Sequence, residues 1–237
     1  MFGKKAARDV SAIIVAGGKG ERMGGELPKQ FMEVLGKPVL SYTIHALSLC
    51  PEIAEIIIVT LGDYLVFCKD LAEEFGFQKV TKIICGGRER QDSVYNGLLE
   101  LPETARYVVV HDGVRPLVRA ETISACIAQA KQFGAAAAAV KAKDTVKTAD
   151  SNQMITGTAN RENLWFVQTP QVFEKKLLLE AHRRAIEDQY TATDDCMLVE
   201  RLGQPVKLVT GEYENIKITT PQDLFIMEGL LEGEEER

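Results

Sequence analysis

The sequence predicts an α/β fold with a mostly parallel sheet, helices on both of its faces, and a projecting β-arm. Short runs rich in β-branched residues alternate with longer segments of helical periodicity, the order expected of a parallel sheet with crossover helices. Some of the short runs, such as Tyr107–His111 (YVVVH), are apolar throughout, as strands covered on both faces should be. A polar, alternating segment interrupts this pattern after Val140 and suggests the arm.

Strands and helices alternate through the first part of the chain. Apolar, β-branched composition predicts strands at Ser11–Ala16, Glu55–Thr60, Val80–Cys85, Tyr107–His111 and Ala135–Val140. Helical spacing of apolar residues predicts helices at Val39–Leu49, Asp63–Phe75, Arg90–Leu101 and Glu121–Phe133. In such a sheet, the ligand is expected beyond the carboxyl ends of the strands.

The arm is expected at about residues 141–160. Lys141–Gly157 is polar and alternating, and Ala149–Asn152 has the composition of a turn, which is typical of a β-hairpin. Because an isolated hairpin is not stable in water, we expect the arm to pack on another surface, such as a second subunit.

The α/β pattern returns after the arm. It predicts helices at Glu174–Gln189 and Thr193–Leu202, strands at Val206–Val209 and Ile216–Thr219, and a last helix that begins at Pro221 with Thr220 as its cap. The Thr193-Asp194-Asp195 sequence is typical of a helix N-cap with acidic residues in the first turn. No sharp boundary is evident, so we predict a single domain over residues 1–237.

The segment from Ile14 to Gln30 (IVAGGKGERMGGELPKQ) carries the strongest functional signal. A strand runs into five glycines within nine residues, Gly18 and Gly20 among them, and such an array can present backbone N–H groups to phosphate oxygens. Arg22 and Lys29 add two cations. The spacing fits neither the dinucleotide fingerprint nor the P-loop. A plain glycine-rich turn is the alternative, but the paired cations favour a site for a nucleoside triphosphate whose phosphorus is attacked.

Other polar residues follow other strands. Asp112 and Arg115 come directly after Tyr107–His111, where Asp suits a sugar hydroxyl or a divalent cation and Arg suits a phosphate; an Asp-Gly turn with an exposed Arg is the alternative. Arg88–Ser93 indicates base or ribose recognition, although a helix N-terminus would explain the same residues.

Composition narrows the class of protein. The net charge of −6 argues against broad nucleic-acid binding, which needs a basic face. No apolar run approaches the length of a membrane span, and the first ten residues lack the apolar core of a signal peptide. The five cysteines form no C-x-x-C pair. Four of them (Cys50, Cys68, Cys85 and Cys126) lie in apolar stretches, where free cysteine behaves as a small hydrophobe. We therefore expect a cytoplasmic protein that binds neither nucleic acid nor membrane.

Seven segments, in this order, resemble the cytidylyltransferases that act on 2-C-methyl-D-erythritol 4-phosphate: AGGKGERMG…LPKQF, GGRERQDSV, HDGVRP, KDTVK, NRENLWFVQTPQVF, TDDCMLVERLG and ENIKITTPQDL. The resemblance spans Val10 to Gly229 and implies a Rossmann-like nucleotidyltransferase fold and a homodimer held by the β-arm. It also implies that, with Mg²⁺ or another divalent cation, the cytidylyl group of CTP is transferred to the methylerythritol phosphate and pyrophosphate is released. This reaction is a step of the non-mevalonate route to isoprenoid precursors.

The resemblance implies roles for individual residues as well. Arg22 and Lys29 match the family's transition-state stabilisers, whereas Arg161 and Lys217 match the residues that position the methylerythritol phosphate. The positions of the cytidine contacts are matched by Ala16, Gly17, Gly87 and Ser93. Those of the substrate pocket are matched by Asp112, Arg115, Thr145, Thr169 and Thr193. Thr145 and Arg161 would reach across from the partner subunit, and no protein ligand for the metal is implied.

Cations suit the reaction that the resemblance implies. In-line displacement at phosphorus needs no protein nucleophile, so catalysis rests mainly on positioning and electrostatics. Two alternatives stay open: a ribitol-5-phosphate cytidylyltransferase with the same chemistry, and a nucleotide-binding relative that has lost activity. NRENLW and TDD favour the methylerythritol family, and the retained cations argue against lost activity. Many members have alanine where this chain has Gly17, Gly113 and Val114, which leaves the strictness of base and sugar-alcohol selectivity open.

Overall fold

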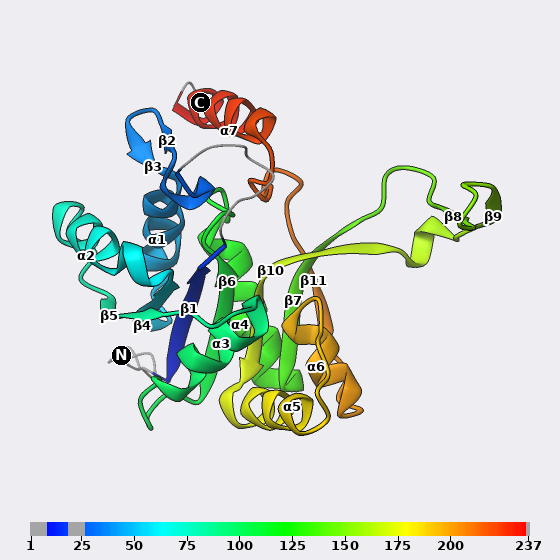
Figure 1. Cartoon of the computed structure of the whole chain (residues 1–237), viewed down its shortest axis with the longest axis horizontal. Helices are drawn as coiled ribbons and strands as arrows, with labels where there is room; N and C mark the ends of the chain where they lie inside the picture. The colour runs from blue at the N-terminus through cyan, green and yellow to red at the C-terminus, as the bar shows by residue number, and fades with distance from the viewer. Residues whose placement is uncertain (1–8, 19–26, 236–237) are drawn as a thin grey trace, which may run out of the picture.

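A seven-stranded sheet runs through the part of the chain that the computed structural model describes, residues 9–18 and 27–235 (Figure 1). Across the sheet the strands are β11 (Lys207–Thr210), β7 (Ala135–Lys141), β10 (Trp165–Glu174), β6 (Tyr107–Asp112), β1 (Val10–Ala16), β4 (Ile53–Thr60) and β5 (Val80–Cys85). Neighbours pair in parallel, except that β10 is antiparallel to both β6 and β7. The predicted α/β fold with a mostly parallel sheet is confirmed.

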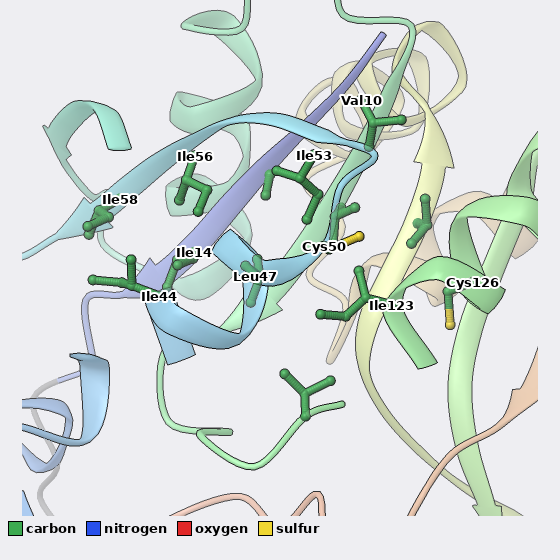
Figure 2. Packing of buried hydrophobic residues seen from close by; sticks show 14 of the residues in the cluster. Val10, Ile14, Ile44, Leu47, Cys50, Ile53, Ile56, Ile58, Ile123 and Cys126 are labelled. Carbon is green, nitrogen blue, oxygen red and sulfur yellow. The ribbon is translucent and has the colours of Figure 1, made fainter. Parts of the chain in front are cut away.

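Helices cover both faces of this sheet. One face packs against α1 (Val39–Leu49), α2 (Leu65–Glu74) and α4 (Ala120–Phe133), and the other against α3 (Arg90–Leu99), α5 (Lys175–Glu187) and α6 (Asp195–Arg201). Because side chains alternate along a strand, Ile14 faces the first layer and Ile13 the second. Figure 2 shows Ile14 on the side of Ile44 and Leu47 of α1. Strands covered on both faces must be apolar on both, which explains runs such as YVVVH.

The arm extends away from the sheet (Figure 1). In it β8 (Lys147–Ala149) pairs antiparallel with β9 (Ile155–Thr158). Oδ1 of Asp150 accepts hydrogen bonds from the backbone N–H groups of Asn152 and Met154, each at 2.9 Å, and so closes the turn. The short elements are η2 (Lys29–Phe31), β2 (Glu33–Val34), β3 (Lys37–Pro38), η3 (Gly62–Tyr64) and η4 (Arg161–Asn163).

Several predictions of local structure were wrong. The sequence pattern predicted no strand over Trp165–Glu174, where β10 lies with Pro170 inside it, a residue that is rare in central strands. The sheet accommodates the proline through an irregular register between Val167 and Gln171. Ile216–Thr219 is not a strand; Ile218 donates one backbone hydrogen bond to Val114, at 2.9 Å, and joins no ladder.

The helix termini and cysteines need smaller corrections. The N-cap of α6 is Asp194 rather than Thr193, with its Oδ1 accepting from the N–H of Met197 at 3.0 Å. The last helix, α7 (Pro221–Glu235), begins at Pro221 as predicted. Cys85 is exposed because it ends the edge strand β5, whereas the other four cysteines are buried. Within the described ranges, no helix combines the length and apolar character that crossing a bilayer requires.

Candidate active site

Several of the described candidate residues lie at the carboxyl ends of neighbouring strands. Ala16, the last residue of β1, pairs with Thr60 of β4, which in turn pairs with Cys85 of β5. On the other side of β1, Val15 pairs with Asp112, the last residue of β6. One edge of the sheet therefore brings together the start of the glycine loop (Gly17 and Gly18), the Gly86-Gly87 turn and the HDGVRP segment.

The start of the glycine loop is held by Gln30. Its Nε2 donates to the carbonyl oxygens of Ala16, at 2.7 Å, and Gly18, at 3.0 Å. Gln30 lies in η2, so these bonds fix Lys29, its mostly buried neighbour, relative to the loop. Gly20 and Arg22 lie outside the described residues.

A second loop, after β5, faces the first. Ser93 Oγ accepts from the N–H of Gly87 at 3.1 Å and donates to the carbonyl of Glu89 at 3.0 Å. A Cβ built on Gly17 would lie 3.7 Å from Ser93 Oγ. Three of the positions matched to cytidine contacts, Gly17, Gly87 and Ser93, thus lie together.

A buried carboxylate, Asp112, lies at the centre of a group of cations. Its Oδ2 is 2.8 Å from Lys217 Nζ and 3.9 Å from Arg115 Nε, and its Oδ1 is 3.0 Å from Arg90 Nε. Burial by itself would raise the pKa of the Asp112 carboxyl, but the Arg90 and Lys217 cations outweigh it and hold this pKa well below its usual range. Asp112 is therefore ionised near neutral pH, and its negative charge holds the surrounding cations in place.

Backbone and amide contacts connect two further residues, Thr169 and Asn215, to the group around this carboxylate. The N–H of Asp112 donates to Thr169 Oγ1 at 3.1 Å, which places Thr169 of β10 against the end of β6. Asn215, fully buried, donates from Nδ2 to the Thr169 carbonyl at 2.9 Å and accepts from Arg115 Nη1 on its own carbonyl at 2.8 Å. Since Asn215 is two residues before Lys217, these bonds fix the segment that carries the lysine.

Three candidate residues lie apart from the Asp112 group in their contacts. Thr145 lies in the arm two residues before β8, and Arg161 follows the β8–β9 hairpin in η4, where its Nη1 donates to the Lys143 carbonyl at 3.4 Å. Thr193 is exposed before α6, and its Oγ1 lies 3.8 Å from Met197 Sδ. No hydrogen bond within the described part of the chain joins these three to Asp112.

The roles of two residues near Asp112 were not predicted from the sequence. Arg90 belongs to the Arg88–Ser93 segment, for which base or ribose recognition and a helix N-terminus were both open; it is the first residue of α3 and binds the carboxylates of Asp112 and Asp195. Asn215 was not singled out at all. The ENIK segment contains it, but a buried asparagine has no sequence signature that separates it from a turn residue.

The described side chains of the candidate site do not by themselves form a metal site. Across residues 9–18 and 27–235, no group of three or more His, Cys, Asp or Glu side chains is arranged to hold a metal ion. Both oxygens of Asp112 are paired with cations. A divalent cation that entered with a nucleoside triphosphate would rely mainly on phosphate and water oxygens, as Mg²⁺ commonly does.

Comparison with known proteins gives a consistent result. The sequence model of the 2-C-methyl-D-erythritol 4-phosphate cytidylyltransferase family matches residues 10–233. The enzyme of that name from Desulforamulus reducens is 48% identical over 224 residues, which cover 94% of this chain and 96% of the relative. The one from Caldanaerobacter subterraneus is 48% identical over 221 residues, or 93% of this chain and 97% of the relative.

Solved structures agree. The 4-diphosphocytidyl-2C-methyl-D-erythritol synthase of Anaerococcus prevotii superposes with a TM-score of 0.86 at 34% identity, covering 96% of this chain and 98% of the other. The 2-C-methyl-D-erythritol 4-phosphate cytidylyltransferase of Thermus thermophilus superposes with a TM-score of 0.75 at 32% identity, covering 94% and 98%.

Proposed function

The chain belongs to the 2-C-methyl-D-erythritol 4-phosphate cytidylyltransferase family, and we propose how its residues perform that family's reaction. The enzyme transfers the cytidylyl group of CTP to 2-C-methyl-D-erythritol 4-phosphate. The products are 4-diphosphocytidyl-2-C-methyl-D-erythritol and pyrophosphate, in the non-mevalonate route to isoprenoid precursors. The observation that supports our assignment of roles best is the meeting of the Gly17–Ser93 loops and the Asp112 cations at one sheet edge.

The nucleotide is proposed to lie between the two glycine loops. Gly17, Gly87 and Ser93 would contact the cytidine, with Ala16 at the end of β1 beneath it. The glycine array with Gly18 and Gly20 would bind the triphosphate, and Arg22 and Lys29 would stabilise the charge that develops at the α-phosphorus. Lys29 suits this role because its backbone is fixed relative to the glycine loop through Gln30, so little reorganisation is needed.

The methylerythritol phosphate is proposed to bind beside Asp112. Lys217, whose side chain is 38% exposed, can turn one side to an incoming phosphate while Asp112 keeps it in place. Arg115, Thr169 and Thr193 would complete the pocket. The phosphate oxygen is already an anion, so it attacks the α-phosphorus without a protein base, and the pyrophosphate leaves on the opposite side.

Mg²⁺, or another divalent cation, is proposed to arrive as the counterion of CTP. Asp112 is engaged by Lys217 and Arg90, so the protein would hold the metal chiefly by holding the triphosphate. A cytoplasmic location belongs to the same proposal.

A homodimer is proposed to complete each site. Thr145 and Arg161 flank an arm that extends away from the sheet (Figure 1), which favours their use in a partner's site over their own. Mixing Arg161→Ala with Lys29→Ala subunits tests this. If Arg161 acts across the interface, mixed dimers contain one intact site, and about a quarter of wild-type activity returns when subunits exchange freely. Absence of recovery, with mixed dimers verified, would mean that the arm serves its own subunit.

Substrate choice is tested by pyrophosphate release from CTP and Mg²⁺. Methylerythritol 4-phosphate and ribitol 5-phosphate are supplied in parallel. Release with the first substrate alone is expected. Release with ribitol 5-phosphate alone would move the chain to the polyol-phosphate enzymes, and CTP binding without release on either would indicate a relative that has lost activity.

A further inference from the structure

Arg90 connects the proposed substrate carboxylate to the helices behind it. It is the first residue of α3, and its side chain reaches two acids on different elements. Nε lies 3.0 Å from Asp112 Oδ1, and Nη1 lies 2.7 Å from Asp195 Oδ2. The side chains of the two acids are only 8% and 1% exposed. One guanidinium therefore bridges two buried carboxylates.

The second carboxylate residue, Asp195, is held by two contacts besides the one with Arg90. Its Oδ1 lies 3.2 Å from Nε2 of the buried His182 of α5, and its N–H donates to Gln171 Oε1 of β10 at 3.2 Å. The Gln171 amide in turn donates to Asp194 Oδ2 at 2.8 Å. These contacts restrain both the backbone and the carboxylate of Asp195, and Asp195 in turn restrains the guanidinium of Arg90.

We infer that Arg90 is a positioning residue for the reaction: braced by Asp195, it holds Oδ1 of Asp112 so that Oδ2 faces Lys217. This inference rests on the proposed function, in which Asp112 and Lys217 receive the methylerythritol phosphate. Arg90 would act through Asp112 and would have no contact with the cytidine.

The role of Arg90 is specific because the two carboxylate oxygens of Asp112 have different partners. Without Arg90, both oxygens would compete for Lys217 and Arg115, and the lysine would be drawn deeper toward the carboxylate. The fork of a guanidinium can meet two carboxylates at once, whereas an ammonium is a single point charge. A lysine at this position should therefore keep only one of the two contacts.

The test uses the full-length enzyme and three variants. Arg90→Met alone leaves Asp195 buried without its cation and can fail to fold. The decisive variant is therefore Arg90→Met with Asp195→Asn, which removes the arginine and the charge that it neutralises. Asp195→Asn alone and Arg90→Lys accompany it. Arg184→Met is the matched control, because Arg184 is exposed on α5 and pairs only with Glu180 and Glu187 among the described acids.

The double variant should bind CTP as the wild type does in calorimetry. Its kcat/KM for methylerythritol 4-phosphate should fall at least about tenfold, on the scale of a misplaced binding group. The kcat/KM of Arg90→Lys should lie between those of the wild type and the double variant, and that of the Arg184→Met control should match the wild type. A merely structural role would lower the active fraction and leave the KM for the sugar phosphate unchanged.

Besides a fall in the active fraction at unchanged KM for the sugar phosphate, two outcomes would overturn the inference. One is a folded double variant with wild-type kcat/KM for the sugar phosphate. The other is a loss of CTP affinity equal to the loss in kcat/KM, which would place Arg90 at the nucleotide instead. A wild-type enzyme inactive on methylerythritol 4-phosphate would refute the proposed function rather than the role of Arg90.

Discussion

Replacing Asn215 with alanine tests whether the segment that carries Lys217 must be held in place. The fully buried Asn215 amide donates to Gln168 Oε1 at 3.1 Å and to the Thr169 carbonyl at 2.9 Å. Alanine removes both bonds but keeps the backbone carbonyl that accepts from Arg115. The change therefore loosens the segment from β10 without removing any charged group.

The expected cost follows from these two bonds. Each contributes about 1 kcal/mol net to folding, and two buried acceptors lose a donor. Against this, Asn215 Oδ1 has no hydrogen-bond partner among the described residues, so its removal offsets part of the loss. We expect about 2 kcal/mol less free energy of unfolding, which a domain with about 5–15 kcal/mol tolerates. The less constrained Lys217 should lower kcat/KM for methylerythritol 4-phosphate on the order of tenfold to a hundredfold.

Urea unfolding and pyrophosphate release measure the two effects separately. Gln204→Ala is the control, because Gln204 is a half-buried amide whose Nε2 donates to the Phe133 carbonyl at 3.0 Å. That bond lies just before the start of β7, at the opposite end of the strand from the candidate site. Gln204→Ala should change neither quantity much. If Asn215→Ala is less stable yet turns over normally, Lys217 is positioned by its pairing with Asp112 alone, and the reasoning is refuted.

Three further predictions concern other groups. Lys29→Ala should raise the barrier by about 3–4 kcal/mol, by analogy with the loss of one preorganised donor, and near wild-type kcat would contradict its role. Gly17→Ala should change the Kd for CTP little, because its Cβ would meet Ser93 Oγ at ordinary contact distance. Gly87→Ala should weaken CTP binding, because its Cβ would clash with Asp92; equal calorimetric Kd values for the two variants would contradict this. Burial lowers the pKa of His111 to about 4, so the unfolded chain takes up a proton first as the pH falls from about 6.5. The free energy of unfolding should drop by about 3 kcal/mol as the pH falls from about 6.5 to about 4. A His111→Gln variant whose unfolding free energy depends on pH as the wild type's does would refute the assignment.

Much of the fold could be predicted because its signals are local. β-Branched runs such as Tyr107–His111 and helical spacing in Val39–Leu49 are set by neighbours in the sequence, and both elements were placed correctly. The position of β10 could not be predicted, because its pairing with β6 and β7 depends on strands that lie far away along the chain. The prediction of a strand at Ile216–Thr219 was wrong because the alternation of this segment resembles a strand, but no described strand lies beside it to pair with it.

The sequence by itself determined the family and the chemical types of the site, since glycines and cations in a fixed order carry the resemblance. Only the tertiary structure decided which of the acidic and basic side chains pair with one another. Arg90 binds Asp112 and Asp195, and Asn215 holds the segment that carries Lys217, through contacts between residues up to 105 positions apart in the sequence. Such contacts are set by how the layers pack on the sheet, and the pattern of residues along the chain does not encode them in a readable form.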